Sequence, residues 1–194
     1  MLTIKIILGS TREGRFSEKI VPWIRDTLAA EKDLALEVLD LRDYPMPFFE
    51  SATPPSYVTS GDYGNPATNA WSKKIGEADG YIIVAPEYNH GYTAVLKNAL
   101  DSVYNEWADK PVAFVAYGGV GGSRAVEQLR LVVEELHLHA TRNAVYIQAP
   151  WNLLDESGAL KAGALDSYAK ALQNTAKDLF WLGDALKAAR AKKG

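Results

Sequence analysis

Continuous apolar runs alternate along the chain with segments in which apolar residues recur at helical spacing. The runs are rich in β-branched residues and predict buried strands at 2–8, 35–41, 81–85, 111–117 and 144–148. The intervening segments predict helices from about Ser17 onward and over about 67–78, 93–107, 123–137 and 164–191. The chain therefore reads as a strand–helix unit repeated five times.

Three local features qualify this pattern. Ser17 and Ser123 are suited to cap the first and fourth helices, because a hydroxyl oxygen can accept from first-turn amides. Pro22 lies about five residues into the first helix, so we expect that helix to start later or to bend there. The stretch 42–66 carries five prolines and predicts a long excursion without regular structure.

Strands that alternate with helices favour right-handed crossovers and a parallel sheet. We therefore predict an α/β fold with a flavodoxin-like, doubly wound, five-stranded parallel sheet of order 2-1-3-4-5 and helices on both faces. With 194 residues the chain is too short for an eightfold barrel, and we expect one domain spanning 1–194. Ligands of such sheets bind beyond the carboxyl ends of the strands, where the loops 9–17, 86–92 and 117–123 should converge.

Charge and composition narrow the function. The formal net charge of −3 offers no positive excess for nucleic acid, so we expect no nucleic-acid partner. The chain has no Cys, which excludes thiolate nucleophiles and Cys-ligated clusters and suits a reducing compartment. The apolar stretch at 4–8 is far too short to span a membrane, so we expect a cytoplasmic protein without a membrane partner.

The first of the three loops has the chemistry of a phosphate cradle. Helix-start amides, hydroxyls and guanidiniums all bind phosphate oxygens. The loop supplies them through Ser10, Thr11, Arg12, Arg15 and Ser17. It is neither a Walker A loop nor a Gly-x-Gly-x-x-Gly turn, which disfavours ATP and a tightly bound dinucleotide. A solvated polar turn would look similar in this loop alone.

The loops 86–92 and 117–123 could contact a planar ligand closely. Pro86, Glu87, Tyr88 and Asn89 combine a rigid ring, an aromatic face and an amide, which suit a planar heterocycle. The third loop has four glycines around Val120, so its backbone can approach a ligand closely. Taken singly, each loop is also compatible with an ordinary turn.

Together these motifs resemble the NAD(P)H-dependent FMN reductase family, which includes quinone, azo-dye and chromate reductases. The resemblance rests on residues 9–12 (GSTR) with Arg15 and Ser17, residues 86–89 (PEYN) followed by 96–101 (LKNALD), and residues 118–124. It implies non-covalent FMN, NADPH or NADH as co-substrate, and a homodimer or homotetramer. It also implies FMN contacts by Ser10, Thr11, Arg12, Arg15, Ser17, Pro86, Glu87, Tyr88, Asn89, Tyr117, Gly118 and Gly119.

The resemblance implies that the flavin carries the chemistry, so we expect no catalytic protein nucleophile. The acceptor would be a free flavin, a quinone, an azo compound or a metal oxyanion. Two alternatives are a flavodoxin-type electron carrier and a flavin-free phosphate-binding domain. His90 is expected at the surface, and His137 with His139 lacks the carboxylates of a metal site. The aromatic residues Tyr57, Tyr63, Trp71, Tyr92, Tyr104 and Trp107 suit either a core or a subunit interface.

Overall fold

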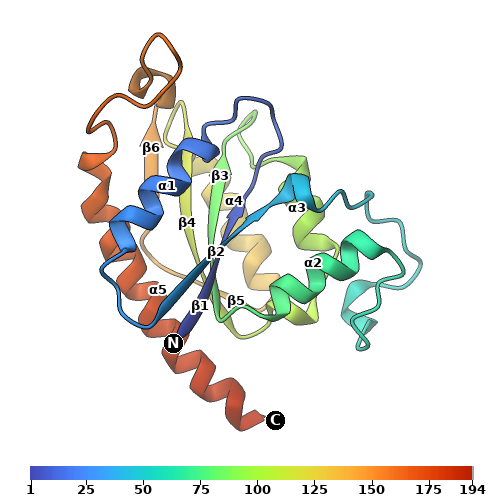
Figure 1. Ribbon diagram of the computed structural model, residues 1–194. Coiled ribbons are helices and arrows are strands. Elements are labelled where there is room, and N and C mark those ends of the chain that lie inside the picture. The colour runs from blue at the N-terminus through green and yellow to red at the C-terminus, as the bar shows by residue number, and fades with distance from the viewer. Residues whose placement is uncertain (194) are drawn as a thin grey trace.

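A computed structural model describes residues 1–193, and a parallel sheet runs through its centre (Figure 1). Its strands are β1 (Leu2–Leu8), β2 (Leu34–Asp40), β3 (Gly80–Pro86), β4 (Lys110–Gly118), β5 (Leu138–Ala140) and β6 (Val145–Gln148). The order is β2-β1-β3-β4-β5, and β6 also pairs with β4. Every pairing is parallel, which confirms the predicted doubly wound order 2-1-3-4-5.

Helices cover both faces of this sheet. They are α1 (Ser17–Leu28), α2 (Pro66–Gly76), α3 (Ala94–Asp101), α4 (Ser123–Glu135) and α5 (Asp166–Lys193). Alternate strand residues enter opposite cores: Ile6 and Ile82 pack with α1 and α5, whereas Ile7 and Ile83 pack with α2, α3 and α4. Because both faces are buried, the central strands are mostly apolar, which explains why the sequence pattern located them.

The fifth position of the sheet differs from the prediction of one strand at 144–148. Both β5 and β6 lie beside β4, and residues 141–144 interrupt them. Val112 pairs with Ala140 and Val115 with Val145. An advance of three residues along β4 therefore corresponds to five residues from β5 to β6. Arg130 turns the intervening carbonyls away from the ladder by donating to Thr141 O at 2.7 Å and to the next carbonyl at 2.9 Å.

The third helix is shorter than the predicted 93–107. It ends at Asp101, and a separate turn follows at Asn105–Trp107. The Trp107 indole is fully buried and donates to Leu100 O at 3.2 Å and to Val103 O at 3.1 Å. These contacts occupy carbonyls that a continuing helix would use, and they place Trp107 in the core instead of on a helical stripe.

The first helix begins at Ser17 and continues through Pro22, so the expected later start is wrong. Loss of one backbone bond is tolerated within the first turns of a helix. Ser17 is the first helical residue and its hydroxyl caps nothing; Phe16 occupies the cap position. Likewise Gly122 occupies the cap position of α4, in the left-handed conformation, so the capping role predicted for Ser123 is also wrong.

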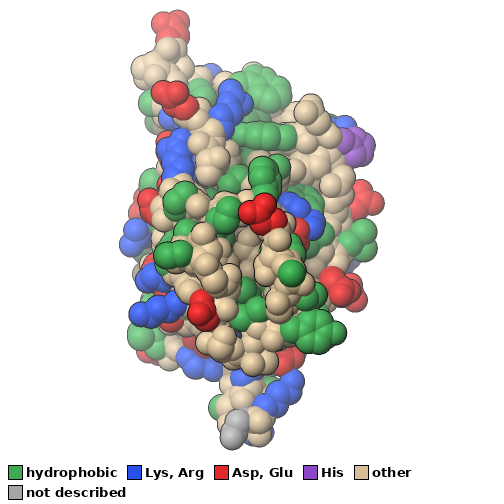
Figure 2. All heavy atoms as spheres, turned by 90° about the vertical axis from the view of Figure 1, so that its right-hand side faces the viewer, with side chains coloured by type: hydrophobic (Ala, Val, Ile, Leu, Met, Phe, Trp, Pro, Cys, Tyr) green, Lys and Arg blue, Asp and Glu red, His purple; other side chains and the backbone are tan. Residues whose placement is uncertain are grey.

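The excursion after β2 has the irregular structure expected of it. It contains only two short turns, at Leu41–Asp43 and Pro55–Tyr57, before α2 begins at Pro66. Asn98 on α3 anchors it: the amide donates to Pro47 O at 2.9 Å and accepts from Phe49 N at 3.1 Å. Figure 2 views the molecule from this side and shows hydrophobic side chains among polar and acidic ones.

Candidate functional site

The loops that follow β1, β3, β4 and β6 meet at the carboxyl edge of the sheet, at the top of Figure 1. They enclose an open pocket of about 250 Å³. Its lining is Arg12, Gly14, Arg15, Phe16, Pro86, Glu87, Tyr88, Tyr117, Gly118, Pro150, Trp151 and Leu154. The pocket therefore lies where a doubly wound sheet binds its ligand, and all three loops singled out in the sequence contribute to it.

Two arginines determine how the first loop faces the pocket. Arg42 donates to Thr11 O at 3.2 Å and to Arg12 O at 2.6 Å, and Arg15 donates to Ser10 O. In a trans peptide the N–H points opposite to the C=O, and the described residues contain no cis peptide. Three consecutive carbonyls held by guanidiniums therefore turn the following amides the other way, as an anion-binding loop requires.

The two predicted arginines of this loop have different environments. The Arg15 guanidinium is buried and forms a two-point ion pair with Asp40 at the end of β2, with Glu18 close by. The hydrogen bonds from Arg15 hold the pKa of Asp40 below its ordinary value. Arg12 is exposed on the pocket rim, and within residues 1–193 its side chain has no ion-pair partner. Arg12 is thus the free cation of the loop, whereas Arg15 braces it against β2.

Ser17 stands at the start of α1 with an unsatisfied hydroxyl. It is fully buried, and its Oγ has no hydrogen-bond partner among the described residues. Buried polar atoms in native folds nearly always have partners, so an orphan at a helix N-terminus points to a missing ligand. Tyr117 faces Ser17 from β4; burial raises the pKa of its phenol to about 12, and Ser17 offsets that rise only partly.

The second loop is tied to the first and to α4. The hydroxyls of Tyr88 and Ser10 are 3.1 Å apart, and a tight turn brings Tyr88 N within 2.8 Å of Gly91 O. Glu87 accepts from the Arg124 side chain at 2.7 Å and from its backbone N–H at 3.1 Å. Burial opposes ionisation of Glu87, but these bonds lower its pKa overall. The Glu87 carboxylate is therefore committed to Arg124 and fixes the loop.

The third loop needs glycine at two places. A Cβ on Gly118 would lie 3.0 Å from Glu87 Cβ, so any side chain there would press on the second loop. Gly122 has φ of +78°, and a Cβ there would lie 2.7 Å from Ala116 Cβ. The glycines thus let β4, the second loop and the start of α4 pack closely beside the pocket.

Most of the predicted contact residues come together here. Arg12, Arg15, Pro86, Glu87, Tyr88, Tyr117 and Gly118 line the pocket, and Ser10, Ser17 and Gly119 adjoin it. Thr11 instead lines a neighbouring depression beside Arg42 and Asn98. Asn89 is exposed in the turn after Tyr88, with φ of +49°.

Sequence reasoning missed a fourth loop. Pro150, Trp151 and Leu154 follow β6 and complete the pocket wall. The signal was available, because the carboxyl end of a fifth parallel strand must reach the same edge of the sheet. The roles of Arg42, Asp40 and Arg124 as braces had no comparable signal, since each acts through contacts distant in sequence.

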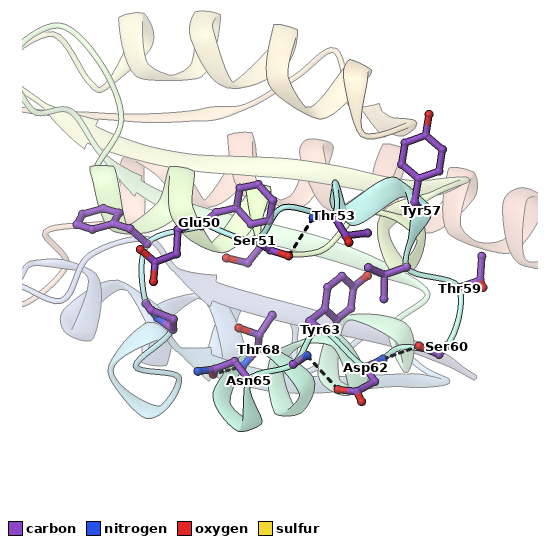
Figure 3. A pocket seen from close by; sticks show the side chains of 16 residues that line it. Glu50, Ser51, Thr53, Tyr57, Thr59, Ser60, Asp62, Tyr63, Asn65 and Thr68 are labelled. Atoms are coloured by element: carbon purple, nitrogen blue, oxygen red, sulfur yellow. Dashed lines mark hydrogen bonds between the residues drawn. The ribbon is translucent and has the colours of Figure 1, made fainter.

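A larger cavity of about 670 Å³ lies within the excursion and shares no lining residue with the pocket (Figure 3). Figure 3 shows side chains of the excursion and of the α2 start around it, with hydroxyl-bearing and acidic groups prominent. Tyr63 on this wall donates to Glu106 at 2.7 Å, and burial raises its pKa. None of the predicted contact residues reaches this cavity.

The aromatic residues of the excursion and following helices divide between core and surface. Trp71 and Trp107 are fully buried and contact each other edge to face, which identifies them as core residues. Tyr57 is 76% exposed. Within residues 1–193 there is no group of three or more His, Cys, Asp or Glu placed to hold a metal ion. No helix in this part of the chain is long and apolar enough to cross a membrane.

Comparison with known proteins gives consistent matches. Residues 2–152 match the family described as NADPH-dependent FMN reductase. The chain is 40% identical over 129 residues to an NAD(P)H-dependent FMN reductase of Schizosaccharomyces pombe, covering 66% of this chain and 64% of that one. It is 33% identical over 144 residues to an NADPH:quinone oxidoreductase of Arabidopsis thaliana, covering 72% and 70%. The match to the yeast protein thus spans slightly less than two thirds of its length.

Solved structures share the fold. The flavoenzyme NAD(P)H:(acceptor) oxidoreductase FerB of Paracoccus denitrificans superposes with a TM-score of 0.71 over 95% of this chain and 98% of that one. At 20% sequence identity this similarity shows a shared fold only.

Proposed function

Because the chain belongs to the NADPH-dependent FMN reductase family, we propose that it is an NAD(P)H-dependent oxidoreductase that binds FMN non-covalently at the carboxyl edge of the sheet. Membership confirms the resemblance identified from the three loops. The match covers residues 2–152 and therefore includes every strand and all three loops.

The phosphate would be held by the first loop and the start of α1. The observation that carries this proposal is the buried Ser17 hydroxyl, which faces only the Tyr117 phenol and makes no hydrogen bond of normal geometry among the described residues. It lies at the N-terminus of a 12-residue helix that no side chain caps among residues 1–193. The unpaired guanidinium of Arg12 supplies charge, and the Glu13 amide, which follows the Arg12 carbonyl held by Arg42, is a further donor; the Arg12 amide already donates to Ser10 Oγ at 3.3 Å. Such a set satisfies a phosphate monoester and has no comparable use in a solvated turn.

The ring would contact the second and third loops. Pro86 and Tyr88 offer apolar and aromatic surface, and Asn89 offers an amide on the same turn. Tyr117, Gly118 and Gly119 would lie at the pyrimidine edge, where Gly119 leaves its backbone accessible. A flat heterocycle needs this combination of apolar walls with a few polar groups.

The chemistry that FMN supplies when bound is two-electron transfer from NAD(P)H to an acceptor. The chain's own groups bind and orient. With a pKa of about 12 the Tyr117 phenol keeps its proton at neutral pH, so it is a hydrogen-bond donor and not a base. Glu87 is paired with Arg124 and is equally unsuited to accept a proton. No protein nucleophile is required.

We extend the proposal to the acceptor and the assembly. Candidate acceptors are a free flavin, a quinone, an azo compound or a metal oxyanion, since an open pocket admits small molecules. The name of the Arabidopsis relative supports the quinone class. We also propose one domain over 1–194, a homodimer or homotetramer and a cytoplasmic location; the absence of Cys from the sequence supports the last.

An anaerobic titration tests the function. We expect the purified protein to bind FMN and its yellow absorbance to bleach on addition of NADPH or NADH, then to return with a quinone. A protein that binds FMN but is bleached by neither nucleotide would be an electron carrier. A colourless protein that ignores added FMN would contradict the proposal altogether.

A further inference from the structure

We propose that Trp151 is a specificity-determining residue that forms an aromatic wall for a planar, uncharged acceptor of the quinone type. This inference rests on the proposed function and names the acceptor class for the same site. The starting observation is that the loop after β6, which the sequence motifs did not include, closes one side of the pocket.

Trp151 is placed to contact a transient ligand. Its side chain lines the pocket and is 61% exposed, whereas the preceding Pro150 is buried. A Cβ built on Gly119 would lie 3.8 Å from the tip of the indole, so the ring reaches to the loop after β4. What distinguishes Trp151 from other exposed aromatic residues such as Trp181 is that it lines the pocket.

The backbone turn that positions Trp151 has a strained conformation at Ala149. Ala149 has φ of +44° and ψ of +58°, a left-handed conformation that a residue with a Cβ rarely adopts. Its N–H donates to Gly118 O at 2.9 Å, and its carbonyl accepts from Asn152 N at 2.9 Å. This turn redirects the chain as it leaves β6. Strain of this kind persists where the surroundings enforce it, characteristically at functional sites.

The loop that carries Trp151 is also well braced. Lys161 donates from Nζ to Asn152 O and from its backbone to Leu153 O, each at 2.9 Å. Leu154 and Leu160 pair as a β-bridge. Asp155 accepts from Ser157 N at 2.9 Å and closes the tip. Trp151 itself lies within the 2–152 family match, and the bracing residues 153–161 follow it.

The chemistry of the wall favours an uncharged planar ring. Residues 149–154 (APWNLL) carry no charge, and Trp151 and Leu154 present aromatic and apolar surface to the pocket. The groups suited to phosphate, Arg12 and Ser17, belong to other elements. An indole face binds a flat aromatic ring by stacking, but it offers no interaction of similar strength to a metal oxyanion.

The test compares two acceptors in FMN-loaded protein. NAD(P)H gives up two electrons and one proton and becomes NAD(P)⁺ in both cases. One 2-methyl-1,4-naphthoquinone takes both electrons, that proton and one solvent proton to become the hydroquinone, while two ferricyanide ions take one electron each and the proton goes to solvent. We expect Trp151→Ala to raise the KM for the naphthoquinone about fivefold. The KM for ferricyanide should rise less than that for the naphthoquinone, so the discrimination between the two acceptors falls, and Trp151→Phe should restore most of the quinone affinity.

A control variant and direct binding measurements complete the design. Trp181→Ala is the matched control, because this tryptophan is 73% exposed on α5 and does not line the pocket. The dissociation constants of FMN and of the naphthoquinone, read from fluorescence, give an outcome independent of turnover. We expect the FMN constant to change less than twofold and the quinone constant to rise with the KM.

Three outcomes would overturn the inference. They are equal quinone KM values in wild type and Trp151→Ala, an equal loss for ferricyanide, or a tenfold weaker FMN affinity, which would make Trp151 a cofactor contact. Failure of the proposed function is distinguishable, because wild type itself would then bind no FMN or remain oxidised with NAD(P)H, and the inference would fail with it.

Discussion

Buried polar groups at the amino ends of the strands (the amino edge) have hydrogen-bond partners, whereas one at the carboxyl ends (the carboxyl edge) has none within residues 1–193. At the amino edge, Asp79 accepts from Thr3 N at 3.0 Å, Lys187 at 2.7 Å and Arg190 at 3.0 Å. Lys110, also buried there, donates to two carbonyls at the end of α2, at 2.9 and 3.0 Å. At the carboxyl edge the Ser17 hydroxyl has no partner among the described residues.

The difference separates groups that stabilise the fold from groups that are reserved for a ligand. The amino-edge contacts join α5 and α2 to the strands, so their loss should affect unfolding and not binding. The carboxyl edge keeps a free cation and an orphaned hydroxyl, so substitutions of Arg12 and Ser17 should affect binding and leave stability nearly unchanged. Each substitution below tests one side of that division.

The largest effect on stability is expected from Asp79→Ala. It removes three hydrogen bonds and leaves Thr3 N unpaired, which should cost about 3 kcal/mol in the free energy of unfolding. FMN affinity should not change. Urea unfolding measures the stability, and an FMN titration on the same preparations measures the affinity. A weakened FMN affinity at unchanged stability would contradict the assignment of Asp79 to the stability of the fold.

The same carboxylate predicts an acid dependence. Burial opposes its ionisation, but bonds from Lys187 and Thr3 hold the pKa of Asp79 below the ordinary 3.8. A lowered carboxyl pKa means stability that is present above about pH 4 and lost as the pH falls through the folded value. The stability difference between wild type and Asp79→Ala should therefore shrink in acid.

The next effect concerns the carboxyl edge. Arg12→Ala removes the free guanidinium of the first loop and should weaken FMN binding about 30-fold, or about 2 kcal/mol. Arg25→Ala, an exposed arginine on α1 outside the pocket, is the control. Fluorescence titration gives both constants. Equal losses in the two variants would show that Arg12 acts only through general charge.

Lys110 provides a pH test of the amino edge. Burial lowers its pKa from 10.5 to about 7, so between these values the folded chain holds it neutral while the unfolded chain protonates it. Stability should therefore rise with pH over that window, by at most about 1.4 kcal/mol per unit from this group. Lys110→Met should flatten the rise in urea unfolding from pH 7 to 10; parallel curves would contradict the assignment.

Ser17→Ala is the smallest and sharpest test. Removing an unsatisfied buried hydroxyl should leave the stability of the FMN-free protein unchanged or slightly higher, because no hydrogen bond is lost. FMN binding should weaken about fivefold, the value of one hydrogen bond to phosphate. Thr175→Ala is a matched control, since its hydroxyl is equally orphaned but lies on α5. A stability loss at Ser17 alone would show that its hydroxyl has a structural partner.

The sequence allowed the strands and the position of the site to be predicted because both depend on local pattern. Fully buried parallel strands are continuous apolar runs, and loops at their carboxyl ends must meet. Features set by tertiary contacts were not predicted: the Trp107 indole ends the third helix early, and the short strand β5 beside Arg130 was missed. The motif likewise could not distinguish Arg15, which pairs with Asp40, from the free Arg12.

The most direct measurement of the central claim compares FMN with riboflavin, which lacks the phosphate. If the first loop is a phosphate cradle, wild type should bind FMN at least about 100-fold more tightly than riboflavin, and Arg12→Ala should remove most of that preference by weakening FMN alone. Equal affinity of wild type for the two flavins would contradict the account.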